Sequence, residues 1–142
     1  MRPVVLSVAG SDCSGGAGIQ ADLKAIEAGG ARAMTVVTAV TAQNAHGVER
    51  VFVLDGELVR AQLAAVAAEA APAAVKSGML GDAPVVRELA QFLRARPPLD
   101  YVCDPVLASS GGVELLSAAG IDALREELFE LTTLLTPNAP EA

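Results

Sequence analysis

The chain has 142 residues, of which 52% are hydrophobic and 19% are charged, and its formal net charge is −7. This length is typical of one domain, residues 1–142, and the hydrophobic content predicts a buried core and excludes a disordered chain. The acidic charge and an aromatic content of 3% argue against nucleic-acid binding, which needs a basic face with stacking side chains.

Membrane insertion and secretion also find no support in the sequence. No apolar run is long enough to span a bilayer, and the first residues lack the long apolar stretch and cleavage site of a signal peptide. The two cysteines, Cys13 and Cys103, are far apart and lack metal-ligand spacing, which is typical of free thiols in a reducing cytosol. We therefore expect a cytoplasmic protein that binds a small molecule, without nucleic-acid or membrane partners.

The chain begins with a strand, a glycine-rich turn and a helix. Residues 4–9 form an apolar run typical of a buried strand, residues 10–18 contain four glycines, and residues 19–28 have the apolar spacing of a helix. Glycines let the backbone approach a ligand closely, and a helix N-terminus offers unpaired N–H groups. Such a turn after a strand is where open α/β sheets hold small ligands.

Two familiar phosphate-binding loops do not fit this turn. The spacing of Gly10 and Gly15 matches a P-loop, but Gly16 stands where the phosphate-binding lysine is required. Residues 16–21 match the loose dinucleotide pattern G-x-G-x-x-A, but the next expected strand ends without an acidic residue for a ribose. The polar residues of the turn, Asp12 among them, fit either ligand contacts or helix caps.

Strands and helices continue to alternate along the rest of the chain. Further strands are expected at residues 34–40, 48–54, 74–77, 101–103 and 133–135. Further helices are expected at residues 57–70 after a cap at Asp55, from Asp82 to before Pro97, and around residues 121–131. Apolar strands that alternate with helices predict a mostly parallel sheet covered on both faces. The polar residues of 48–54 suit a strand that projects from the main sheet.

Polar and glycine residues gather just after the expected strands. The carboxyl ends of parallel strands meet at one edge of a sheet, so these turns are expected to line a single cleft. The five turns are residues 10–12, 43–44, 78–79, 104–105 and 137–138.

Several motifs together resemble one enzyme family. Residues 9–24 read Ala-Gly-Ser-Asp-Cys-Ser-Gly-Gly-Ala-Gly-Ile-Gln-Ala-Asp-Leu-Lys, and further matches follow at 38–44, 76–80, 104–106 and 135–141. In this order they are similar to the hydroxymethylpyrimidine/phosphomethylpyrimidine kinases of thiamine biosynthesis, over essentially the whole chain. These transferases are ribokinase-like, so the resemblance implies a three-layer α/β/α sandwich with a substrate cleft at one edge of the sheet.

The resemblance implies that the glycine-rich turn lines a pyrimidine pocket and does not hold the phosphates of ATP. Gly10, Asp22, Gln43 and Val106 would then contact the substrate, and Met79 would form an apolar wall. An amide such as Gln43 can match the donor and acceptor edge of an aminopyrimidine, and the Asp22 carboxylate can accept from its amine or hydroxymethyl group. Without the family, Gln43 also fits a loop amide that caps backbone groups, and Asp22 fits a solvated residue of a first helical turn.

The resemblance also implies a site for magnesium and phosphate. Asn138 and Glu141 match the N-x-x-E pattern with which ribokinase-like enzymes organise Mg²⁺ and the phosphates of ATP, largely through water. Asp104 could support the same metal, because Mg²⁺ favours hard oxygen ligands and keeps some of its waters, and a plain turn residue is the alternative. Lys76 fits either a cation facing the cleft or a surface lysine, and His46 fits a loop residue better than a general base.

The family's chain continues for about as long again, with a Gly-Thr-Gly-Cys or Gly-Thr-Gly-Asp anion hole, the catalytic base and most of the adenine pocket. No Gly-Thr-Gly occurs in residues 1–142. We therefore expect a fold truncated on its C-terminal side, no catalytic residue in this portion, and no activity of this chain alone. A homodimer is expected when the protein is full length, because projecting strands often join a partner in ribokinase-like enzymes. The alternatives are a pyridoxal or pyridoxine kinase of the same superfamily, and a non-catalytic module that binds the pyrimidine.

Overall fold

Each apolar segment expected to form a strand does so in the computed structural model, which describes residues 1–142. The strands are β1 (Val4–Asp12), β2 (Arg32–Asn44), β3 (Gly47–Val53), β4 (Ala74–Ser77), β5 (Asp100–Cys103) and β6 (Leu134–Leu135). The helices are α1 (Gly18–Ala28), α2 (Gly56–Glu69), α3 (Ala83–Arg94) and α4 (Ala118–Ala123). Strands β1 and β2 run further than expected, because their pairing continues past the apolar run to Asp12 and Thr41.

The six strands form one sheet in the order β3-β2-β1-β4-β5-β6. Neighbouring strands are parallel except for β3, which is antiparallel to the carboxyl-terminal part of β2. The expectation of a mostly parallel sheet is therefore confirmed. Strand β3 is the edge strand of this sheet and does not lie outside it, and the edge position lets its polar residues face solvent.

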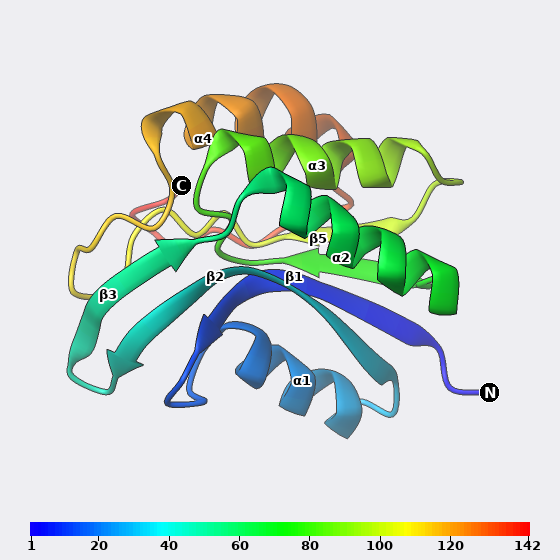
Figure 1. Ribbon diagram of the computed structural model, residues 1–142, viewed down its shortest axis with the longest axis horizontal. Helices are drawn as coiled ribbons and strands as arrows, with labels where there is room; N and C mark the ends of the chain where they lie inside the picture. The colour runs from blue at the N-terminus through cyan, green and yellow to red at the C-terminus, as the bar shows by residue number, and fades with distance from the viewer.

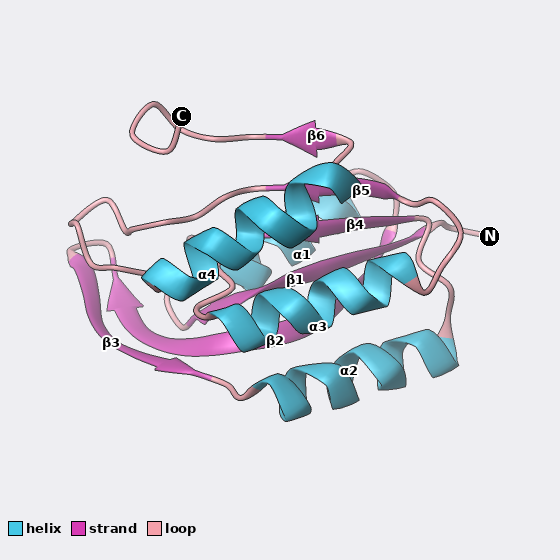
Figure 2. Ribbon diagram, turned by 90° about the horizontal axis from the view of Figure 1, so that it is seen from above, coloured by secondary structure: helices cyan, strands magenta, loops and turns pink.

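Helices cover both faces of the sheet. Helix α1 lies against one face, and α2, α3 and α4 lie against the other (Figure 1). Figure 2 shows these three helices side by side over the sheet, with α1 behind it. The largest core cluster has 21 buried residues, which include residues of α2, α3 and α4 but none of α1. The three-layer sandwich is confirmed, and its α1 layer is the thinner one, since only Ile19 of that helix is buried.

Side-chain caps begin three of the helices. The Asp55 carboxylate accepts a hydrogen bond from the N–H of Leu58 at 2.7 Å and starts α2, as its sequence position predicts. Asp82 caps α3 and Ser117 caps α4. The hydroxyl of Ser117 also donates to Asp82 at 2.5 Å. The capping side chains of these two helices are therefore hydrogen-bonded to each other.

The last helical segment differs from its prediction. Helix α4 stops at Ala123 and continues as a π-helical turn (Leu124–Leu128) and a 3₁₀ turn (Phe129–Leu131). Leu124 and Leu128 are buried in the core in this arrangement. Apolar residues three and four apart fit a regular helix and these turns equally well, so their spacing did not reveal the irregularity. None of the helices combines the length and apolar character that crossing a bilayer requires.

Candidate substrate site

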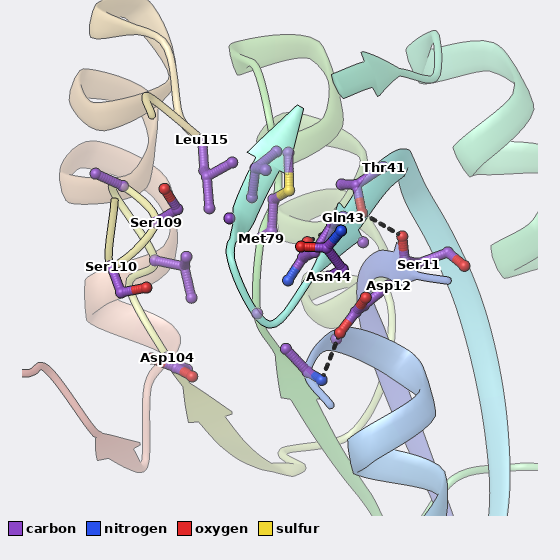
Figure 3. Close-up of a pocket in the computed structure, with 18 of the residues that line it drawn as sticks. Ser11, Asp12, Thr41, Gln43, Asn44, Met79, Asp104, Ser109, Ser110 and Leu115 are labelled. Carbon is purple, nitrogen blue, oxygen red and sulfur yellow. Dashed lines mark hydrogen bonds between the residues drawn. The ribbon is translucent and has the colours of Figure 1, made fainter. Parts of the chain in front are cut away.

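A cavity of about 310 Å³ lies where the carboxyl ends of β1, β4 and β5 meet the turn between β2 and β3 (Figure 3). Four of the five polar turns line it. Of the residues singled out in the sequence, those lining it are Gly10, Asp12, Gln43, Lys76, Met79, Asp104 and Val106. The volume lies at the small end of the range for small-molecule sites.

The turn at residues 137–138 does not reach this cleft. Strand β6 is the outermost strand, beyond β5, so the segment that follows it lies at the far edge of the sheet. Pro137 and Glu141 line a different cavity, together with Pro105 and Leu107. The expectation that five turns share one cleft is wrong for this turn, because the order of strands decides which loops are neighbours.

Asp12 organises the glycine-rich turn from within. It is 3% exposed, and its carboxylate accepts from the N–H and hydroxyl of Ser14 at 2.9 and 2.8 Å. Its other oxygen accepts from the N–H groups of Gly16 and Ala17 at 3.0 and 2.8 Å. Burial acts to raise the pKa of Asp12, but these hydrogen bonds outweigh it and hold the pKa below its ordinary value. Helix α1 has no side-chain cap, so Asp12 is not a helix cap; its hydrogen bonds hold the loop that leads into α1.

Two glycines allow close contacts where this turn crosses the end of β1. Gly18 has a φ of +58°, and a Cβ there would lie 2.2 Å from the carbonyl oxygen of Gly10. A Cβ on Gly10 would lie 3.0 Å from the sulfur of Met79. Only glycine therefore fits at position 18, whereas a larger residue at position 10 would displace the Met79 side chain.

Gln43 lies at the end of β2, and the oxygen of its side-chain amide is hydrogen-bonded within the protein. The hydroxyl oxygen of Thr41 lies 3.0 Å from Gln43 Oε1 and 2.9 Å from the carbonyl oxygen of Ser11. The thiol of Cys13 contacts the main chain of Gln43, with its sulfur 3.2 Å from the carbonyl oxygen. The amide nitrogen Nε2 of Gln43 has no hydrogen-bond partner in the protein, so it can donate to a molecule in the cleft. Figure 3 shows Gln43 in the cleft close to Met79 and Thr41.

Lys76 and Asp22 form an ion pair beside the cleft. Lys76 Nζ lies 2.9 and 3.1 Å from the two carboxylate oxygens of Asp22, which also accepts from the hydroxyl of Ser7 at 2.6 Å. Lys76 lines the cavity. Of its two predicted roles, a cation facing the cleft is therefore the correct one, and a surface lysine is not. Asp22 is only 16% exposed and does not line the cavity. It is neither a solvated helix residue nor in direct contact with the cleft.

Asp104 is the carboxylate that faces the cleft beside Lys76, at 3.9 Å from its Nζ. Burial raises the pKa of Asp104 above its ordinary value, Lys76 opposes this, and the charges of Glu141 and Asp22 add to it. A hard, partly buried carboxylate of this kind suits a cation with retained waters.

The side chains of Asn138 and Glu141 each accept a hydrogen bond from the other residue's backbone N–H. The N–H of Asn138 donates to Glu141 at 3.0 Å, and the N–H of Glu141 donates to the side-chain oxygen of Asn138 at 3.0 Å. Glu141 also accepts from the N–H of Leu107 at 3.4 Å, which ties this turn to the segment after β5. No group of three or more His, Cys, Asp or Glu residues is placed to hold a metal ion. Of the three expected magnesium residues, Asp104 alone lies in the cleft.

Some residues that line the cleft carry no signal of a binding role in the sequence. Thr41, Ser109, Ser110 and Leu115 all contribute. Ser109 and Ser110 follow β5 in a turn closed by a hydrogen bond from the N–H of Gly112 to the carbonyl of Ser109 at 2.9 Å. The Ser-Ser-Gly-Gly run signals a turn, but nothing in it signals that the turn folds back over the cleft.

Comparison with known proteins identifies the family. The phosphomethylpyrimidine kinase family matches residues 12–142. The chain belongs to this family. It is 44% identical over 138 residues to the hydroxymethylpyrimidine/phosphomethylpyrimidine kinase of Haemophilus influenzae, and the alignment covers 97% of this chain and 51% of that protein. The chain thus spans about half the length of this curated relative.

Solved structures of family members and related kinases have the same fold. The phosphomethylpyrimidine kinase of Clostridium difficile superimposes with a TM-score of 0.89 at 41% identity, over 99% of this chain and 61% of that one. A pyridoxal kinase of Bacillus subtilis superimposes with a TM-score of 0.86 at 34% identity, over 99% of this chain and 52% of that one. The expected family and ribokinase-like fold are confirmed.

Proposed function

We propose that this chain is the substrate-binding portion of a kinase that transfers the γ-phosphate of ATP to 4-amino-5-hydroxymethyl-2-methylpyrimidine, and then to its monophosphate, in thiamine biosynthesis. The observation that carries the proposal is the meeting of Gly10, Gln43, Met79 and Val106 in one cleft of a chain that belongs to this family. These are four of the five residues that the resemblance assigns to the pyrimidine.

Each of these residues has a distinct task in the proposed site. Gln43 donates from its free Nε2 to a ring nitrogen, and its Oε1 retains capacity to accept from the exocyclic amine. Met79, which is 8% exposed, and Val106 supply apolar contact with the ring. Gly10 leaves room for the heterocycle at the end of β1. Asp22, the fifth residue, lies outside the cavity and binds the Lys76 ammonium group.

ATP and Mg²⁺ are the proposed cofactors, and Mg²⁺ would neutralise phosphate charge during transfer. Asp104 is the residue in the cleft that fits a water-retaining divalent cation. Asn138 and Glu141, which hold each other, would contribute by fixing the segment after β6 beside Leu107.

Two further proposals concern the setting of the protein. The free thiols of Cys13 and Cys103 suit a reducing, cytoplasmic location. Strand β3 suits a homodimer contact, because it is an edge strand on which Phe52 is 69% exposed opposite Val40, which is 51% exposed.

A pyridoxal kinase is the second candidate, favoured by the 34% identity with the B. subtilis enzyme. Calorimetric titration of the chain with hydroxymethylpyrimidine and with pyridoxal separates the two. We expect the pyrimidine to bind at least about tenfold more tightly than pyridoxal, because one good hydrogen bond contributes about that much affinity. Tighter binding of pyridoxal would contradict the proposal, and binding of neither would favour a role for the cleft outside both reactions.

A further inference from the structure

The cleft contains a single cation, and its surroundings suit one kind of ligand group. Lys76 is the only lysine or arginine among the residues that line the cavity. Its Nζ lies between two carboxylates, 2.9 Å from Asp22 and 3.9 Å from Oδ2 of Asp104. Lys76 and Asp104 line the cavity and Asp22 does not. A ligand therefore meets the ammonium group and the Asp104 carboxylate side by side.

Residues outside the cavity hold the Lys76 ammonium group in place. Asp22 of α1 binds it through both carboxylate oxygens, and Ser7 of β1 holds one of these oxygens at 2.6 Å. The lysine side chain is 27% exposed, so most of its stem is packed. The hydrogen bonds to Asp22 occupy at most two of the three N–H groups of an ammonium, which leaves at least one for a ligand.

We propose that Lys76 and Asp104 together recognise the hydroxymethyl group of the pyrimidine, Lys76 as the donor and Asp104 as the acceptor. This inference rests on the proposed function. A separation of 3.9 Å is too long for a direct hydrogen bond, but one oxygen atom can lie within hydrogen-bond distance of both groups. A hydroxyl is the group that accepts and donates through a single oxygen.

A phosphate group fits this position less well. It gains from Lys76, but the two negative charges of Asp22 and Asp104 exceed the one positive charge. In the absence of a cation at Asp104, the pair therefore favours the neutral alcohol of the first phosphoryl transfer. The Asp22–Ser7 contact makes Asp22 a positioning residue for Lys76.

The experiment compares two ligands that differ only in this hydroxyl, hydroxymethylpyrimidine and 4-amino-2,5-dimethylpyrimidine. Their dissociation constants are measured by calorimetry for the wild-type chain and for Lys76→Met. The wild type is expected to prefer the alcohol by about tenfold or more, because a lost hydrogen bond to a charged group costs at least that much. Lys76→Met should lose this preference and keep its affinity for the dimethyl compound. Lys24→Met, which changes the only other lysine, lies outside the cleft and should behave as the wild type.

A second variant guards against a folding defect of Lys76→Met. Asp104→Ala leaves the Asp22–Lys76 pair in place and should also lose the preference for the alcohol. Equal weakening of both ligands by either variant, or equal binding of both ligands by the wild type, would overturn the inference while leaving the proposed function intact. Binding of neither pyrimidine by the wild type would instead overturn the proposed function, and this inference with it.

Discussion

Asp12 and Gln43 lie at the carboxyl ends of β1 and β2 and both line the cleft, yet they have different polar partners. The two carboxylate oxygens of Asp12 are used by hydrogen bonds from the turn in which it lies. Gln43 has one amide oxygen contacted by Thr41 and an amide nitrogen without a protein partner. A buried group whose bonds are satisfied stabilises the fold, whereas an unpaired donor in a cavity is available to a ligand.

Replacing Gln43 by alanine tests its assignment to the pyrimidine. We expect Gln43→Ala to weaken binding of hydroxymethylpyrimidine by about 1–3 kcal/mol, because the ligand's buried polar edge loses its partner. Titration calorimetry measures the change. Gln91→Ala, at an exposed position on α3, is the control and should bind as the wild type does. Unchanged affinity in Gln43→Ala would remove this residue from the site.

Replacing Asp12 by asparagine tests its structural role. The introduced side chain has one NH₂ group where the carboxylate has a second acceptor oxygen, so part of the turn would lose its acceptor. We expect Asp12→Asn to lower the free energy of unfolding by about 1–3 kcal/mol at pH 7. Urea unfolding measures this value. Asp122→Asn, at an exposed position on α4, is the matched control and should change stability little.

The same variant makes a prediction about pH. The pKa of Asp12 is lower in the folded state than its ordinary value of about 3.9, so its charged form is the one that stabilises the fold. This contribution is complete above the ordinary pKa and is lost as the pH falls through the lowered one. The stability difference between the wild type and Asp12→Asn should therefore shrink in acid below about pH 4. A constant difference from about pH 7 down to about pH 3 would show that the charge is not the cause.

At the scale of the elements, α1 and β3 border the cleft although they bury few residues. Helix α1 buries only Ile19, and the Asp22–Lys76 pair adds a polar tie to the sheet. Strand β3 pairs only with β2, and its other edge is free. Both elements border the cleft through the glycine-rich turn and the β2–β3 turn. The shape of the site therefore depends on elements with few buried contacts.

Replacing Phe52 by glutamate tests the proposed dimer. Phe52 and Val40 are cross-strand partners on an exposed surface, so a charge there would oppose association without disturbing the core. We expect sedimentation velocity of the full-length protein at micromolar concentration to show two copies for the wild type and one for Phe52→Glu. Leu58→Glu changes another apolar side chain, on α2, that is 48% exposed and should leave the mass unchanged. A wild type of monomeric mass would contradict the proposal.

At the scale of the whole molecule, the cleft lies toward one side of the sheet, and the outer edge of β6 has no neighbouring strand. Leu134 and Leu135 of β6 are 55% and 39% exposed, and the second cavity, beside Pro137, is lined by apolar residues of α4 and of the turns that follow it. We expect the further strands and helices of a longer chain to pack on these surfaces.

A protein consisting of residues 1–142 alone is therefore expected to lack appreciable kinase activity. No Gly-Thr-Gly segment is present to hold the transferring phosphoryl group, and loss of such donors and of the base costs several orders of magnitude in rate. ATP-dependent phosphorylation of hydroxymethylpyrimidine is measured beside the full-length H. influenzae relative. Turnover within about tenfold of that enzyme would show that the second half is dispensable. The open edge should also make this portion prone to association.

The order and type of most elements followed from the sequence, because apolar periodicity and side-chain caps such as Asp55 act between residues close in the chain. The family and four of the turns that form the cleft could also be predicted, since parallel strands carry their following turns to one edge. Tertiary structure decided the rest. The position of β6 at the far edge separates Asn138 from the cleft, and the packing of α1 against the sheet turns Asp22 toward Lys76. Both depend on contacts between residues distant in sequence, and no local pattern encodes which strands and helices become neighbours.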